Sequence, residues 1–255
     1  MNSKSIIINL IIFFSLMLGC NTTNELFIYS NEKQISQQKI PISIKVNHHK
    51  DFILGSIKIR GGSSISYPKK SYEIDLFDDV KLLGLPKDDD WILNANFIDK
   101  TFLRHVISYE IFQDMNDIYK VAKSKYIELY VNDNYEGLYV LMQKLDKSSL
   151  KIQEKDESSF IFKDPHIFRE NYNNILPQKE GNFHQQIFPK FFNSNKNGFL
   201  EEIRDFILNS NDSIFSEYIV DFFDINNIID WHLLLLMTNN SDGVLKNFYM
   251  YKINS

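Results

Sequence analysis

Four short stretches in the first third of the chain alternate apolar and polar residues, and this pattern constrains the fold most. Alternation with a period of two is typical of β-strands that turn one face toward a core. Because the stretches follow one another closely, we expect neighbouring strands to pair in the antiparallel sense. The predicted strands cover 25–29, 40–46, 53–59 and 71–77.

Helical patterns and shorter strands fill the rest of the chain. A turn at 132–137 separates two predicted strands of a hairpin, 125–130 and 138–141. Asp99 can cap a helix that runs to about Met115. The apolar run 228–237 is long enough for a buried helix, and two more helices are predicted at 200–208 and 214–223. A short strand is predicted at 159–163, followed by a long ordered insertion at 164–198.

The composition supports a real core and argues against nucleic acid as a partner. Apolar residues make up 44% of the chain and aromatic residues 14%. The net charge is -5 and no basic block is present, so nucleic-acid binding is not expected. Three successive aspartates, 88–90, lack the alternating ligand spacing of an EF-hand. They predict a solvated acidic turn before a buried strand.

The N-terminus has the pattern of a secretory leader. Lys4 precedes an apolar run at 6–18, which is too short for an ordinary membrane-spanning helix and fits a signal-peptide core. Cys20, the only cysteine, follows Gly19 and resembles the lipidated cysteine of a bacterial lipobox. The sequence therefore predicts a lipid anchor at Cys20 and an extracytoplasmic location, and the alternative is a plain secretory signal. About 235 residues remain for one large domain or two lobes.

A glycine- and serine-rich loop follows the third predicted strand. It reads Arg60, Gly61, Gly62, Ser63 and Ser64, and Lys69 and Lys70 come shortly after it. Accessible backbone N–H groups and hydroxyls in such a loop can cradle phosphate oxygens. The alternative is a flexible hairpin turn with surface lysines, and the loop lacks the G-x-G-x-x-G pattern of protein kinases.

A polar loop near the end of the chain carries Asp242 and Asn247. It lies between the apolar run at 228–237 and a short predicted strand at 248–251. The spacing D-x-x-x-x-N is that of the protein-kinase catalytic loop, in which the Asp accepts the proton of the substrate hydroxyl and the Asn binds magnesium. Because Asn and Asp are abundant in this chain, an ordinary polar turn is the alternative.

Taken together, these motifs resemble one family, the spore-coat CotH-type atypical protein kinases. The matching stretches, in family order, are 57–76, 82–105, 126–146, 183–190 and 224–252. The resemblance implies a two-lobed, kinase-like α+β fold with an antiparallel N-lobe sheet and a helical C-lobe. In this chain the implied parts are a signal peptide at 1–19, a tether at 20–24, an N-lobe at 25–150 and a partial C-lobe at 151–255.

The resemblance also implies a reaction and the residues that perform it. The chain is expected to transfer the γ-phosphoryl group of ATP, with Mg²⁺, to Ser or Thr hydroxyls of a protein substrate. Asp242 would be the catalytic Asp and Asn247 a magnesium ligand, while residues 60–64 would cover the phosphates. Lys70 would contact the phosphates, with Lys69 as the alternative. The remaining implied residues are Glu110, as the partner of Lys70, and the adenine edge at 141–144, which includes Met142 and Gln143.

Two departures from the family pattern affect these expectations. Gln143 stands where the family usually has Glu, which puts the contact to adenine in doubt. The family also places a metal-binding Asp, in a Trp-Asp-x-Asp segment, after the catalytic loop, and the sequence stops at Ser255 before such a segment. We therefore expect impaired catalysis. The alternatives are a surface-displayed binding module or adhesin without catalysis, and a structural coat protein.

Overall fold

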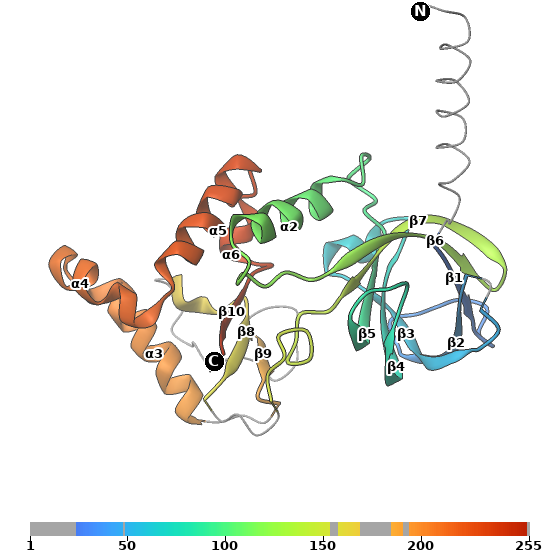
Figure 1. Cartoon of the computed structure of the whole chain (residues 1–255), viewed down its shortest axis with the longest axis horizontal. Coiled ribbons are helices and arrows are strands. Elements are labelled where there is room, and N and C mark those ends of the chain that lie inside the picture. The colour runs from blue at the N-terminus through green and yellow to red at the C-terminus, as the bar shows by residue number, and fades with distance from the viewer. Residues whose placement is uncertain (1–23, 48, 154–157, 169–184, 191–193, 254–255) are drawn as a thin grey trace, which may run out of the picture. The chain divides into compact units, whose positions relative to one another are not determined.

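The computed structural model describes residues 24–47, 49–153, 158–168, 185–190 and 194–253 (Figure 1). Contacts group the chain into two compact units. Unit 1 comprises the residues up to Arg60 together with 70–95 and 125–141, and unit 2 comprises 61–69, 96–124 and 142–255. The chain passes between the units several times, whereas the predicted lobes assume a single cut near residue 150. The assignment of those lobes stays a prediction.

Unit 1 is a closed β-barrel. Its strands hydrogen-bond in the order β1-β2-β3-β4-β5-β7-β6, and β6 pairs with β1 to close it. Strands β1 to β5 pair antiparallel, as predicted, but β1 and β6 run parallel. The expected antiparallel sheet is confirmed for these neighbouring strands, but its closure into a barrel was not predicted, because pairing between strands far apart in the sequence leaves no local signal. The strands are β1 (Glu25–Tyr29), β2 (Ile40–Val46), β3 (Ile53–Arg60), β4 (Ser71–Lys81), β5 (Lys87–Asn94), β6 (Ser124–Val131) and β7 (Asn134–Gln143).

The alternation of the strands fills the barrel interior. On β1, Leu26 and Ile28 are fully buried, and the residues on either side of them are only partly buried. Each such aliphatic side chain stabilises the fold by roughly 1.5–3 kcal/mol. Gly55 on β3 allows a close approach, because a Cβ there would lie 2.5 Å from the carbonyl oxygen of Asp75 on β4. The hairpin between β6 and β7 turns at Asn132 and Asp133, whose φ angles of 47° and 62° indicate a type I′ turn.

Asp88 lies inside β5 and is fully buried, so the prediction of a solvated acidic turn at 88–90 was wrong. Its Oδ1 accepts hydrogen bonds from the N–H groups of Asp89 and Asp90 at 3.0 and 3.2 Å. Its carbonyl oxygen accepts a bond of 3.1 Å from the indole N–H of Trp91. A buried carboxylate is tolerated when hydrogen bonds replace its water. From the sequence alone, an aspartate at this position is expected to be exposed.

Unit 2 combines a three-stranded antiparallel sheet with helices. The sheet has the order β10-β8-β9, formed by β8 (Phe160–Lys163), β9 (Gln185–Phe188) and β10 (Tyr249–Lys252). Strand β8 confirms the prediction at 159–163. It is buried on both faces, since Phe160 and Phe162 belong to one core cluster and Ile161 to another. Residues 169–184 and 191–193 of the predicted insertion lie outside the described residues.

The helices of unit 2 match the predicted ones closely. They are α2 (Arg104–Met115), α3 (Ser194–Asn209), α4 (Asp212–Phe222) and α5 (Ile225–Met237). Asn211 caps α4 by accepting the N–H of Ile214 at 3.0 Å, and Asp224 caps α5 by accepting the N–H of Asn227 at 3.1 Å. Among the described residues, none of the helices is long and apolar enough to cross a membrane. The predicted signal peptide and Cys20 lie outside the described residues.

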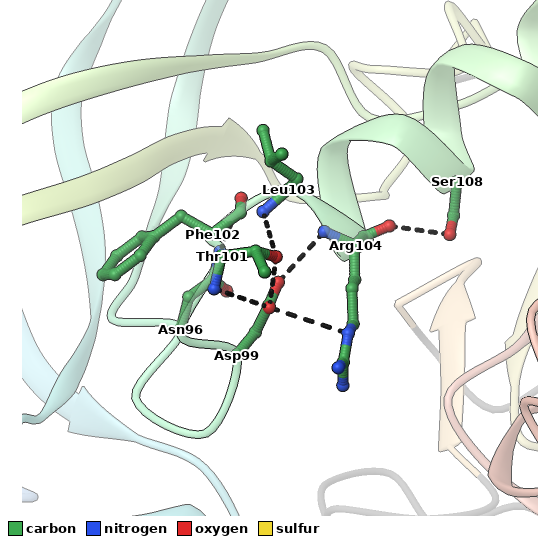
Figure 2. Close-up of polar contacts among 7 residues, drawn as sticks. All are labelled: Asn96, Asp99, Thr101, Phe102, Leu103, Arg104 and Ser108. Carbon is green, nitrogen blue, oxygen red and sulfur yellow. Dashed lines mark hydrogen bonds and ion pairs between the residues drawn. The ribbon is translucent and has the colours of Figure 1, made fainter.

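Asp99 holds the start of α2, as Figure 2 shows. Its Oδ2 accepts the N–H of Arg104 at 3.0 Å, and its Oδ1 accepts the hydroxyl of Thr101 at 2.6 Å. Asp99 thus contacts the start of α2, as predicted, but it is not the N-cap residue: that position is Leu103, whose side chain makes no capping hydrogen bond. Burial alone would raise the pKa of Asp99, but hydrogen bonds from Thr101 and Arg104 and the charge of Arg104 outweigh it and lower that pKa below its ordinary value.

Helix α5 was predicted to be buried, but only one of its faces is buried. Leu234 and Leu235 are buried, whereas its other face exposes large apolar side chains. These are Ile229, Leu233, Leu236 and Met237, with exposed fractions of 50, 51, 65 and 62%. A helix that is apolar on all sides is normally enclosed by its neighbours. The sequence pattern therefore predicted more burial than unit 2 provides.

Candidate functional site

The loop after α5 presents Asp242 and Asn247 to solvent. Asp242 is the first residue of a single helical turn, α6 (Asp242–Leu245), so the predicted loop contains a short helix. The Asp242 side chain is 58% exposed, and its Oδ2 lies 3.1 Å from Nζ of Lys246. This ion pair has the i,i+4 spacing that a helical turn favours. Lys246 adds a positive charge beside the carboxylate, and the sequence analysis did not single it out.

Hydrogen bonds from the end of α5 fix the approach to Asp242. The hydroxyl of Thr238 donates to the carbonyl oxygen of Leu234 at 2.7 Å, and the N–H of Asn240 donates to that of Leu235 at 2.9 Å. Gly243 packs tightly against α5, because a Cβ there would lie 2.5 Å from Cδ2 of Leu235. A glycine directly after Asp242 therefore allows α6 to lie against the buried side of α5.

Asp164 fixes the other end of the same loop, and the sequence analysis missed it. Asp164 is 2% exposed, its Oδ1 accepts the N–H of Phe248 at 2.9 Å, and its own N–H donates to the carbonyl oxygen of Phe248 at 2.9 Å. This two-way clamp holds the residue after Asn247. Asn247 itself is exposed and has a φ of 64°, a left-handed conformation that Asn tolerates better than most residues. Asp164 directly follows a predicted strand, but no local pattern connects it to a loop more than eighty residues away in the sequence.

Two contacts anchor α5 itself. Trp231 packs against Phe248, with ring centroids 5.7 Å apart. On another side, the buried Tyr119 donates its hydroxyl to Oδ2 of Asp230 at 2.7 Å. Burial, together with the hydrogen bond and the charge of Asp230, raises the pKa of Tyr119 to about 12. The helix that carries the loop is therefore attached to both the β10 end and the segment after α2.

In the loop at 60–64, one backbone position requires glycine. Gly61 has a φ of 129°, and a Cβ there would lie 2.1 Å from Oγ of Ser64, so only glycine fits. A turn of 3₁₀ helix, η1 (Ser63–Ser66), follows. The N–H groups of Gly61 and Gly62 can donate hydrogen bonds to a ligand oxygen that approaches this loop.

The two candidate lysines have different surroundings. The Nζ of Lys69 lies 5.0 Å from the ring centroid of Phe102, within unit 2, and Tyr67 of the same loop stacks on Phe97 with centroids 5.4 Å apart. Lys70 belongs to unit 1, where its carbonyl oxygen accepts the hydroxyl of Tyr139 at 2.9 Å. The side chain of Lys69 thus contacts a ring of unit 2, whereas the bond at Lys70 is made by its backbone, and which of the two lysines contacts phosphate stays a prediction.

The remaining predicted residues are placed as follows. Glu110 is exposed on α2 of unit 2, while Arg60 and Lys70 belong to unit 1, so the pairing of Lys70 with Glu110 stays a prediction. Met142 and Gln143 are both 5% exposed at the end of β7, and the N–H of Gln143 donates to the carbonyl oxygen of Lys123 at 3.0 Å. Asp242 and Asn247 share the loop after α5, within unit 2.

The chain is therefore a mixed α+β protein with a barrel unit and a helical unit that presents a D-x-x-x-x-N loop. A family model described as "CotH kinase protein" matches residues 57–255. Because this match covers most of the chain, the protein belongs to the CotH kinase family, as the motifs indicated. A kinase-like function is thus shown at the level of the family. Among curated proteins, none matches the chain.

Proposed function

We propose that this chain transfers the γ-phosphoryl group of ATP to Ser or Thr hydroxyls of a protein substrate. The observation that carries the proposal is the loop after α5, in which Asp242 and Asn247 are exposed and fixed at both ends by hydrogen bonds. Phosphoryl transfer depends mainly on positioning and on neutralising charge, so a rigid loop with these two side chains suits the chemistry. Membership of the CotH kinase family supports the same reaction.

A two-lobed, kinase-like architecture is part of this proposal. It is supported by the two compact units and by the mixture of sheet and helix. In unit 1 the sheet expected for the N-lobe is closed into a barrel. The proposal therefore requires that this barrel serve as the N-lobe.

The chain carries the kinds of chemical group that bind ATP and magnesium. The amide oxygen of Asn247 is an oxygen ligand of the kind that magnesium prefers. The backbone N–H groups of Gly61 and Gly62, with Arg60 and Lys70 nearby in the chain, fit a polyphosphate. Magnesium would supply charge neutralisation on the phosphates. Because magnesium is usually held by one or two carboxylates and Asn247 offers only an amide oxygen, we expect slow turnover.

The chain's own residues would act on the acceptor hydroxyl. The carboxylate of Asp242 would accept a hydrogen bond from that hydroxyl and take its proton as the oxygen bonds to the γ-phosphorus of ATP, while the bond from that phosphorus to the bridging oxygen breaks and ADP leaves. Lys246 would orient the carboxylate through their ion pair. Asp164 would keep Asn247 in place by holding Phe248.

Nucleotide binding tests the proposal and also separates the two lysines. We expect calorimetry to show magnesium-dependent ATP binding that Lys70→Ala weakens about tenfold, since a lysine on phosphate contributes a strong charge-assisted contact. Lys69→Ala, the matched control, should change the affinity little. If Lys69→Ala had the larger effect, the assignment of Lys70 would be wrong. A folded protein that bound no ATP would contradict the proposed function.

One observation favours a second function, that of a binding module without catalysis. The carboxylate of Asp242 is already engaged by Lys246, and an ion pair at the proton acceptor would slow the reaction. A well-folded protein that binds ATP but transfers no phosphate under any metal condition would support this alternative.

We also propose that the protein is extracytoplasmic and anchored to the membrane through a lipid on Cys20. The support is the apolar run at 6–18 followed by Gly19 and Cys20. Metabolic labelling with a fatty-acid analogue should mark the wild type and leave Cys20→Ala unlabelled. Equal labelling of both would show that the lipid, if any, is attached elsewhere.

A further inference from the structure

The outer face of the barrel carries a group of aromatic rings where β1, β6 and β7 meet. Phe27 lies opposite Tyr130 in the parallel pairing of β1 with β6, and their rings stack with centroids 4.7 Å apart and planes at 17°. Tyr130 also contacts Tyr135 of β7, with centroids 5.2 Å apart. Tyr135 is 58% exposed. The rings therefore form a continuous surface on the side of the sheet away from the core.

Carboxylates surround these rings. Glu25 and Glu128 lie opposite each other on β1 and β6, and Asp133 sits in the turn between β6 and β7. The hydroxyl of Tyr135 donates to Glu128, and the hydroxyl of Tyr29 donates to Oδ1 of Asp133 at 3.1 Å. We call this set the aromatic–acidic patch; it comprises Glu25, Phe27, Tyr29, Glu128, Tyr130, Asp133 and Tyr135.

The charges of the aromatic–acidic patch are unbalanced. Among the described residues, no Lys, Arg or His lies within ion-pair distance of Glu25, Glu128 or Asp133. In the strand register, Lys45 on β2 lies opposite Phe27, so the three carboxylates share this face with one lysine of β2. On β4 of the same barrel, by comparison, Asp75 is paired with Lys39 and Glu73 with Lys58. Like charges facing each other across neighbouring strands destabilise a sheet.

Ring stacking alone explains only part of this arrangement. Stacked rings across β1 and β6 stabilise the strand pair that closes the barrel. They do not require three unpaired carboxylates, two of which accept hydrogen bonds from tyrosine hydroxyls beside the rings. Aromatic faces attract cations, and a tyrosine whose hydroxyl donates to a carboxylate has a more electron-rich ring. The negative charge repels nucleic acid and other anions, so the complementary ligand is a cation.

We propose that the aromatic–acidic patch docks a basic polypeptide segment, with Arg or Lys side chains over the rings of Tyr130 and Tyr135 and beside Glu128 and Asp133. An extended segment can offer several such side chains at once, which matches a surface that spans three strands. If the proposed kinase function holds, this surface recruits substrates that carry a basic stretch apart from their phosphorylated Ser or Thr. The docking itself needs no nucleotide, so it can be tested independently of catalysis.

The test is fluorescence anisotropy of a labelled Arg- and Ser-containing peptide, measured without ATP on the purified protein. We expect binding that weakens with added salt, because the charges lie at the surface. Glu128→Gln combined with Asp133→Asn should reduce the affinity about fivefold, and Tyr130→Leu by a similar factor, since each removes contacts of modest strength. A peptide with every Arg replaced by Gln should bind much more weakly.

Matched controls lie on β4 of the same barrel. Asp78→Asn combined with Asp79→Asn removes the same charge from an exposed part of β4, and Phe77→Leu removes a ring that is 69% exposed. Both should leave the affinity unchanged, and the midpoint of thermal unfolding should confirm that every variant is folded. The proposal is overturned if the β4 charge variant loses as much affinity as the patch variant, or if the basic peptide does not bind. Equal binding of the Gln peptide, or preferential binding of phosphatidylcholine vesicles or a neutral oligosaccharide, would also overturn it.

Discussion

The barrel of unit 1 and the helices of unit 2 bury their apolar residues to very different extents. The barrel interior contains a continuous cluster in which Leu26, Ile74 and Leu129 are fully buried. In unit 2, by contrast, α4 and α5 leave much of their apolar surface exposed, with Val220 at 63% and Leu236 at 65%. The candidate catalytic loop lies in unit 2. This difference teaches that the chain's stability rests mainly on the barrel, while its chemistry rests on a less enclosed unit whose loop depends on specific hydrogen bonds.

The largest effect is expected from the same substitution made in both units. Leu129→Ala on β6 removes a fully buried side chain and should lower the free energy of unfolding by about 2–5 kcal/mol. Leu236→Ala on α5 removes a side chain that is 65% exposed and should change it by at most about 0.5 kcal/mol. Urea unfolding followed by circular dichroism measures both. Equal losses would show that α5 is enclosed in solution and would break the comparison.

Asp164 should give the next largest effect, because its clamp is buried. Asp164→Ala leaves the N–H of Phe248 without its acceptor and should cost about 1–3 kcal/mol. Asp164→Asn retains an acceptor oxygen and should cost clearly less. Asp221→Ala on the exposed side of α4 is the control for loss of a carboxylate. Hydrogen exchange at Phe248 is the direct measurement, and unchanged exchange in Asp164→Ala would mean that the loop is held by other contacts.

The same substitution, glycine to alanine, is expected to have a clear effect at Gly61 and almost none at Gly62. Gly61→Ala forces a side chain into a backbone with a φ of 129° and against Ser64, so it should cost about 1–3 kcal/mol or rearrange the loop. A Cβ on Gly62 would meet nothing within 4 Å, so Gly62→Ala should be nearly silent. The unfolding free energy and the affinity for magnesium–ATP report both changes. A larger effect at Gly62 would contradict the described loop conformation.

The smallest expected effect is the pH dependence of stability that Asp99 contributes at the start of α2. The folded-state pKa of Asp99 is lower than its ordinary value of 3.8, so its contribution to stability is complete above that value and is lost as the pH falls through the folded pKa. Thermal unfolding between about pH 5 and about pH 2 should therefore show a steeper loss for the wild type than for Asp99→Asn. Identical pH profiles would mean that the Asp99 carboxylate does not accept the N–H of Arg104 in solution.

Much of the fold could be predicted from the sequence because its signals are local. Alternation located β1 to β4, and the residues at 132 and 133 located a turn that requires positive φ angles. Closure of the barrel by β1 and β6 could not be predicted, since it depends on pairing between distant strands. The burial of Asp88 was not predicted for a related reason: only the folded chain supplies the N–H groups that allow it.

The candidate site was predictable to a similar degree. The spacing of Asp242 and Asn247 identified the loop, and the glycine pair identified a second loop in which Gly61, but not Gly62, has a backbone conformation that requires glycine. Asp164 and Lys246 were missed, because their roles depend on contacts across the fold or on the helical turn at α6. The exposed face of α5 was missed because apolar periodicity indicates which residues favour burial, while the surrounding elements decide which of them are buried.

The central claim, that the loop after α5 carries phosphoryl transfer, is tested most directly with Asp242→Asn. The measurement is incorporation of labelled phosphate from γ-labelled ATP into a Ser-rich acceptor with magnesium, alongside calorimetric ATP binding. We predict that the slow wild-type rate falls by roughly 100-fold or more in Asp242→Asn, because loss of a general base typically costs that much, while ATP binding is retained. An unchanged rate in Asp242→Asn would contradict the account.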